Sequence, residues 1–178
     1  MKNEEYQKLF LAAVQDGASL ESAPKWAWTP EVCLAAVQQS YKAIQSMDEE
    51  HKTYGVCLAA VKKCGWTLCH VPNRYRTPEL CLAAVTQYGW ALYSVPEKEK
   101  TPEVCLVAVK GYGAAVQFVP ETLKTSEVCL TSVQENGWNL CQIPLRCRTP
   151  EVCLAAIKNY PDAIQWSPYS VLELMSIK

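Results

Sequence analysis

The sequence predicts an all-α fold, an α-solenoid of about seven 24-residue repeats in which a long helix is followed by a short one. Apolar residues recur at the spacing of an amphipathic helix, and no segment shows the two-residue alternation of a strand over a useful length. The 24-residue period is marked by six cysteines in similar surroundings: Cys33, Cys57, Cys81, Cys105, Cys129 and Cys153. Such a period indicates a repeat architecture.

Residues 1–28 are predicted to form a degenerate N-terminal capping repeat. Leu11-Ala-Ala-Val14 resembles the recurring stretch, but this segment lacks both its threonine and its cysteine. A solenoid needs atypical terminal repeats to cover its open ends. The charged start of the chain, with Glu4 and Glu5, does not resemble a secretory signal peptide.

Residues 29–166 are predicted to hold six regular repeats, each starting with a long helix. In Thr29-Pro-Glu-Val-Cys-Leu-Ala-Ala-Val37, the threonine can cap the helix N-terminus, proline suits the first helical position and glutamate complements the helix dipole. We expect a helix of about 11 residues. Glycines such as Gly65 and Gly137 are interpreted as the left-handed residues that end it.

A short helix follows each long one. In Trp66-Thr-Leu-Cys-His-Val71, the apolar residues Leu68 and Val71 are spaced as in one or two turns of α- or 3₁₀-helix, and Pro72 then ends the segment. A polar connector leads to the next threonine. The tryptophans that open these segments are predicted to pack at the junction of the two helices: Trp66, Trp90 and Trp138.

Residues 167–178 are predicted to form a C-terminal capping helix that starts at Ser167-Pro168 and runs through Leu172 and Met175. With this helix in place, residues 1–178 make a single repeat domain.

The pattern Thr-Pro-Glu-(Leu/Val)-Cys-Leu-Ala-Ala-Val…Gly-Trp-x-Leu-x-x-Val-Pro, which recurs over about residues 29–168, resembles a bacterial tandem-repeat family of unknown function. That family is frequent in bacteria that live inside or with eukaryotic cells. Its period is similar to that of the leucine-rich repeat variant, whose units alternate α- and 3₁₀-helices. The resemblance implies the fold and a role at a host interface, but it carries over no catalytic residue.

Packing is the first explanation for the side chains that could react or bind a metal. The period-24 cysteines fall on the apolar face of the long helix, where a reduced thiol behaves as a small hydrophobe. We expect no catalytic residue, no metal and no cofactor, because neither histidine lies in a nucleophile-activating pattern and Cys64, Cys69 and His70 lack the paired spacing of zinc sites. A thiol-redox or zinc-binding protein remains the alternative function.

A row of basic residues precedes the threonines, and glutamates follow them: Lys52, Arg76, Lys100, Lys124 and Arg148 before, and Glu31, Glu79, Glu103, Glu127 and Glu151 after. We interpret these charges as an exposed ladder that bridges neighbouring repeats. The other reading is a cationic stripe that grips RNA or an acidic partner. The formal net charge of −1 does not favour nucleic-acid binding, so RNA is the second alternative.

Two positions of the short helix vary while the rest of the repeat stays constant, which is how repeat proteins build binding faces. The residues predicted to bind a partner are His70, Tyr93, Phe118, Gln142 and Trp166. The predicted function is a non-catalytic, monomeric protein-interaction scaffold, acting as a host-directed bacterial effector or a stoichiometric inhibitor. We expect it in the bacterial cytoplasm, or translocated into a host cell, without membrane contact.

Overall fold

The computed structural model describes residues 2–176 of the chain, and all regular elements in that range are helical. The chain divides into two compact units, Met1–Gln87 and Tyr88–Lys178. The predicted all-α class is confirmed, and so is the regular alternation of long and short helices.

Six α-helices of ten residues carry the 24-residue period: α2 (Pro30–Gln39), α4 (Tyr54–Lys63), α5 (Pro78–Gln87), α6 (Pro102–Gly111), α7 (Ser126–Glu135) and α8 (Pro150–Asn159). Their length is close to the one expected. The helix α1 (Lys2–Gln15) precedes them, and the short helices α3 (Ala43–Ser46) and α9 (Val171–Met175) complete the α-helical elements of the described residues.

The short helix of most repeats is a six-residue 3₁₀-helix: η3 (Gly65–His70), η5 (Gly89–Ser94), η7 (Gly113–Phe118), η9 (Gly137–Gln142) and η11 (Pro161–Trp166). The connectors, which the sequence did not identify as helical, contain a further three-residue 3₁₀ turn: η4 (Asn73–Tyr75), η6 (Glu97–Glu99), η8 (Glu121–Leu123) and η10 (Leu145–Cys147). Two such turns, η1 (Leu20–Ser22) and η2 (Lys25–Ala27), lie in the first repeat.

The predicted threonine caps are confirmed. Each threonine oxygen accepts a hydrogen bond from the backbone N–H three residues later, at 3.2–3.4 Å. Thr29 and Thr101 illustrate the geometry, since both have extended backbone and are followed by proline at the first helical position. The cap therefore fixes where each long helix begins.

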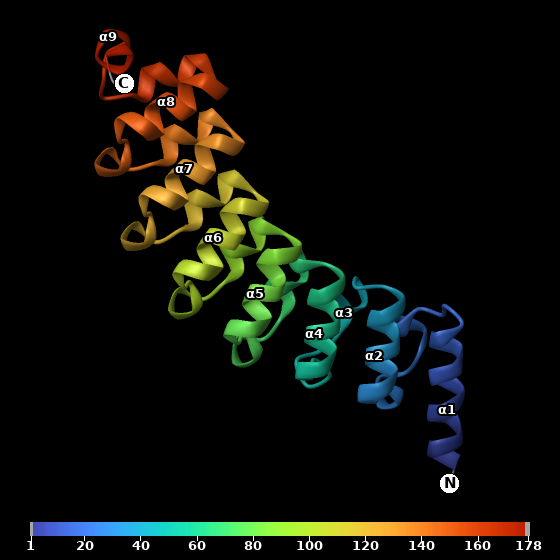
Figure 1. The fold of residues 1–178 in the computed structure, drawn as a ribbon. Helices are drawn as coiled ribbons and strands as arrows, with labels where there is room; N and C mark the ends of the chain where they lie inside the picture. The colour runs from blue at the N-terminus through green and yellow to red at the C-terminus, as the bar shows by residue number, and fades with distance from the viewer. Residues whose placement is uncertain (1, 177–178) are drawn as a thin grey trace. The chain divides into compact units, whose positions relative to one another are not determined.

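Within the first compact unit, the long helices pack in sequence order, α1 on α2, α2 on α4 and α4 on α5, while η3 packs against α3, α4 and α5. Figure 1 shows these long helices side by side at the blue-to-green end of the chain. The core between the layers contains Val56, Cys57, Val61 and Leu68, all 0–1% exposed.

The second compact unit repeats this arrangement (Figure 1). Helices α6, α7 and α8 pack in order, and the 3₁₀-helices η5, η7, η9 and η11 form a second row against them. Val104, Cys105, Val109 and Val116 fill the space between the two rows. Each repeat thus covers the apolar side of the next, as in a helical solenoid.

The glycines after the long helices do not serve the purpose expected from the sequence. Among the described residues, only Gly17 has a positive φ, at 100°. A Cβ at Gly65 would instead overlap the carbonyl oxygen of Ala84, and one at Gly137 would overlap that of Ala156. These glycines are needed because the backbone of the following helix approaches too closely for any side chain.

The C-terminal segment begins its helix later than expected. Ser170, rather than Ser167, is the N-cap of α9, and it forms a capping box with Glu173. Residues 1, 177 and 178, which the predicted capping segments include, lie outside the described residues.

Candidate functional site

Four side chains of the second compact unit form what we call the first aromatic cluster: Trp90, Tyr93, Tyr112 and Phe118. The Phe118 ring meets Trp90 and Tyr93 edge-on, with centroids 4.8 and 5.3 Å apart, and Tyr112 lies 5.6 Å from Trp90. Edge-to-face rings at these separations attract one another beyond simple burial. Tyr93 is nevertheless 69% exposed and Tyr112 41%. The cluster is therefore internally packed and open to solvent.

The second aromatic cluster consists of Trp138, Tyr160 and Trp166. Trp138 meets Trp166 edge-on at 4.7 Å and Tyr160 at 6.0 Å, while Tyr160 stacks on Trp166 at 6.4 Å. Trp138 comes from η9, Tyr160 caps the C-terminus of α8, and Trp166 ends η11. Trp138 is 48% exposed, so this cluster also presents aromatic surface.

The two clusters are built from equivalent positions. Trp90, Tyr112 and Phe118 are followed 48 residues later by Trp138, Tyr160 and Trp166. The repeat between them has small or polar residues at these three positions, namely Ala114, Asn136 and Gln142. Because equivalent positions of stacked repeats face the same way, both clusters open on the side of the second compact unit that carries the ends of the 3₁₀-helices.

The residues predicted to bind a partner are distributed as follows. Tyr93 and Phe118 meet in the first cluster, and Trp166 belongs to the second. Gln142 occupies the intervening repeat, where its side-chain oxygen is buried without a hydrogen-bond partner and its carbonyl accepts from the Lys124 amine at 3.3 Å. Their role in binding stays a prediction.

His70 lies in the first compact unit, where its ring meets Trp66 edge-on at 5.1 Å. Burial, together with the charge of Lys52, lowers the pKa of this imidazole. Its Nε2 atom is buried without a hydrogen-bond partner. The His70 imidazole is therefore neutral at physiological pH. Together with the partly exposed Trp66 ring it forms one aromatic surface.

The tryptophans pack against other rings, as the sequence predicted, and two of them are also partly exposed. These two, Trp66 and Trp138, are 42% and 48% exposed and contribute surface. Tyr112 and Tyr160 were not singled out at all. The signal that identifies both clusters is the spacing that Trp90 and Trp138 share, 22 residues to a tyrosine and 28 to the aromatic residue that ends the next 3₁₀-helix.

The predicted exposed ladder of basic residues needs correction, because Lys52, Lys100 and Lys124 are largely buried. The side chains of Lys100 and Lys124 are only 9% and 7% exposed. Each pairs with the glutamate three residues earlier, Glu97 at 2.6 Å and Glu121 at 2.7 Å, rather than with the glutamate after the threonine. Both ammonium groups are thus paired with a carboxylate, which a nearly buried cation requires.

Arg148 shows what this basic position does for the candidate surface. Its guanidinium donates to the carbonyl oxygens of Ile143 at 2.8 Å and Trp166 at 2.5 Å. These carbonyls lie just after η9 and at the last residue of η11. Arg148 therefore ties two consecutive 3₁₀-helices together and positions the backbone of Trp166.

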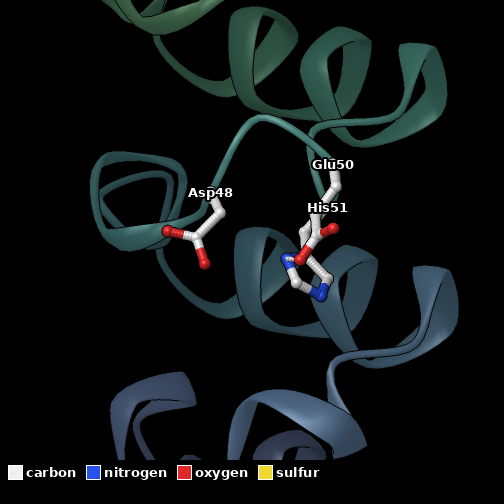
Figure 2. Close-up of side chains that lie close together, drawn as sticks. All are labelled: Asp48, Glu50 and His51. Atoms are coloured by element: carbon white, nitrogen blue, oxygen red, sulfur yellow. Dashed lines mark ion pairs between the residues drawn. The ribbon is translucent and has the colours of Figure 1, made fainter.

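One group of metal-ligating side chains exists in the described residues. The donor atoms of Asp48, Glu50 and His51 lie within 4.8 Å of one another (Figure 2). Asp48, however, accepts a hydrogen bond from Lys25 at 2.5 Å, which lowers the pKa of its carboxyl. The Nδ1 atom of His51 lies 3.7 Å from Glu50. Two carboxylates and an imidazole suit a divalent ion, but here the Asp48 carboxylate is already paired with Lys25.

The period-24 thiols lie where the sequence predicted. Cys33, Cys57, Cys81, Cys105, Cys129 and Cys153 are all 0% exposed, and all ten cysteines carry free thiols. Burial raises the pKa of Cys33, Cys57 and Cys105 to about 11. Thiols with so high a pKa are protonated at physiological pH and poor nucleophiles.

Comparison with known proteins adds one finding. Residues 55–99 match a family model described as a domain of unknown function (DUF4116), which corresponds to the stretch from α4 to η6. No curated protein and no solved structure was found to match the chain. Within residues 2–176, none of the helices has the length and apolar character required to cross a bilayer.

Proposed function

We propose that the protein is a non-catalytic repeat scaffold that binds a protein partner through its first and second aromatic clusters. The observation that supports this most directly is the pair of partly exposed aromatic clusters at equivalent positions two repeats apart. Aromatic side chains dominate the binding energy of protein interfaces, because they bury a large area with few rotatable bonds. Here the edge-to-face contacts hold them in place before binding.

The surroundings favour a protein over RNA as the partner. The amines of Lys100 and Lys124, which could have gripped phosphates, pair with glutamates and are almost buried. Nucleic-acid binding depends on exposed cations that replace counterions. A surface built from partly exposed aromatic rings suits apolar side chains of a folded protein or peptide.

The partner's origin forms part of the proposal. The sequence resemblance to repeats of host-associated bacteria favours a host protein as target, bound by an effector or by a stoichiometric inhibitor. Lysate of a eukaryotic host cell is therefore the first material in which to seek it, and bacterial lysate is the comparison.

The test is affinity capture with the full chain, followed by alanine substitution in the first cluster. Tyr93→Ala and Phe118→Ala, together, should reduce the captured amount of the specific partner at least tenfold, because aromatic hot spots contribute about 2 kcal/mol or more each. The measurement is quantitative mass spectrometry, followed by the dissociation constant of the purified pair.

Leu145→Ala is the matched control. Leu145 and Tyr93 are both 69% exposed in the second compact unit, but Leu145 lies in the connector turn η10, outside both clusters. Its removal should leave capture unchanged. If the Tyr93/Phe118 variant stays folded and captures as much partner as the parent chain, the clusters are not the binding surface.

A further inference from the structure

The connector turn η10 lies close to the N-terminal end of α7, the long helix of its own repeat. Arg146 of η10 pairs with the Glu121 carboxylate at 3.0 Å and also donates to the Glu121 carbonyl. The next residue, Cys147, donates from its thiol to the carbonyl oxygen of Lys124 at 3.1 Å. Lys124 immediately precedes Thr125, the N-cap of α7. Cys147 is therefore held at the start of α7.

The period-24 thiols point toward this same place in their own repeats. The Cys57 sulfur lies 3.8 Å from the carbonyl oxygen of Lys52, and that of Cys153 lies 3.6 Å from the carbonyl oxygen of Arg148, five residues upstream in both cases. The equivalent oxygen for Cys129 belongs to Lys124, which is the acceptor that Cys147 uses. The Cys147 thiol therefore lies at the end of α7 that the Cys129 thiol also occupies, and the two thiols share a side-chain hydrogen bond.

The two thiols also act on each other directly. Burial and the neighbouring Cys147 thiol raise the pKa of Cys129 to about 12. No other period-24 cysteine is followed by a second cysteine 18 positions later. The residues 18 positions after Cys57, Cys81 and Cys105 are Tyr75, Glu99 and Leu123.

We propose that Cys129 and Cys147 are a site of oxidative modification, where a peroxide closes an intramolecular disulfide that fastens η10 to α7. A disulfide requires sulfur atoms near 2 Å apart and Cα atoms within about 7 Å. Thiols that share a side-chain hydrogen bond need only a small movement to reach that geometry. The period-24 cysteines cannot do so with one another, because stacked helices lie about 8–10 Å apart.

The chemistry assigns different roles to the two sulfurs. Cys147 is half-buried and reacts first: its sulfur attacks one peroxide oxygen, the O–O bond breaks, and the departing hydroxide takes the thiol proton to leave as water. This gives a sulfenic acid at Cys147. The Cys129 sulfur then attacks the Cys147 sulfur, the S–O bond breaks, and the hydroxide leaves with the Cys129 proton as a second water. The contact between the two side chains offsets the weak nucleophilicity that the raised pKa of Cys129 implies. Two thiols are oxidised by two electrons, and one peroxide is reduced to two waters.

The test treats the reduced full chain with hydrogen peroxide, blocks remaining thiols with an alkylating reagent in denaturant, and maps the peptides. Cleavage after Lys, Arg and Glu places the relevant thiols on separate peptides: 128–135 with Cys129, 136–146 with Cys141, and 147–148 with Cys147. We expect peptides 128–135 and 147–148 to be joined, with the mass of the pair lower by two hydrogen atoms. A reductant should separate them.

Two variants make the result decisive. Cys141→Ser removes a half-buried thiol from the same short stretch and should leave the bond intact. Leu123→Cys places a thiol 18 residues after Cys105, as Cys147 lies after Cys129, and should yield a second disulfide between Cys105 and position 123. Cys147 oxidised without a bond to Cys129, or bonded to Cys141, would overturn the proposal. So would recovery of both thiols reduced under conditions that oxidise Cys69, which is exposed.

Discussion

Gly65 shows how the absence of one carbon atom decides the packing of a repeat. A Cβ at this residue would overlap the Ala84 carbonyl oxygen of the following long helix. Gly55, by contrast, lies in the first turn of α4, where a methyl group on its Cα would meet nothing within 4 Å. The same residue type is obligatory at one position and dispensable at the other.

The first prediction follows from this contrast. Gly65→Ala should lower the free energy of unfolding by about 1–3 kcal/mol, since a packed neighbour must shift. Gly55→Ala should raise it by about 0.4–1 kcal/mol, because alanine restricts the unfolded chain without strain in the helix. Urea denaturation of both variants measures the two values. Equal effects in the two variants would contradict the close-contact explanation.

At the scale of the single element, α7 differs from its neighbours at its first residue. Helices α2, α5, α6 and α8 start with proline, whereas α7 starts with Ser126. The preceding Thr125 has φ −73° and ψ 165°, a backbone conformation that a residue before proline adopts readily. The site is therefore already shaped for proline.

We predict that Ser126→Pro stabilises the protein by roughly 0.4–1 kcal/mol, through the reduced freedom of the unfolded chain. Ser126→Ala is the matched control and should change stability much less. Thermal and urea unfolding provide the measurement. A loss of stability with proline would mean that the Ser126 N–H makes a bond that the fold requires.

How far the sequence predicts each element depends on whether a local rule determines it. The long helices follow from the Thr-Pro-Glu start, because the cap and the proline act within one turn. The three-residue turns such as η4 and η10 carry no local pattern and depend on contacts with the preceding repeat, such as Arg146 with Glu121. For the same reason the buried state of Lys124 was not predictable, since its acceptors Glu121 and Gln142 come from two separate elements.

The candidate surface was predictable in part. Variation at the ends of the short helices pointed to Tyr93, Phe118 and Trp166, because those positions differ among otherwise similar repeats. Their neighbours Tyr112 and Trp138 occupy positions at which three of the six regular repeats carry an aromatic residue. The sequence interpretation assigned Trp138 to packing and did not single out Tyr112. Only the fold shows that a ring at such a position lies on another ring and also faces solvent.

At the scale of the whole molecule, the buried thiols give the protein a sensitivity to alkali. A cysteine in an unfolded chain titrates near pH 8.5, whereas Cys33, Cys57 and Cys105 have a pKa of about 11 in the fold. Between these values the unfolded state has lost protons that the native state keeps. The free energy of unfolding therefore falls as the pH rises through this window, and these thiols have no effect below it.

We predict that Cys105→Ala reduces this alkaline loss by roughly 1–2 kcal/mol between about pH 8 and pH 10. Urea titrations with reductant at the two pH values measure it, and the difference between variant and parent cancels the tyrosines and lysines that titrate nearby. Removal of an exposed thiol by Cys69→Ser should leave the pH dependence as it is. If the free energy of unfolding of Cys105→Ala depends on pH as steeply as that of the parent chain, water reaches the period-24 thiols in the native protein.

The close approach of glycine to a later carbonyl has one more consequence, for how such a chain can change in length. The contact joins residues 19 positions apart, as in Gly65 with Ala84 and Gly137 with Ala156. An insertion or deletion between the two residues changes which residue lies against the carbonyl oxygen, and any residue other than glycine would overlap it. Whole multiples of 24 residues preserve the 19-residue separation between such a glycine and its carbonyl, so we expect arrays of this kind to change length in complete repeats.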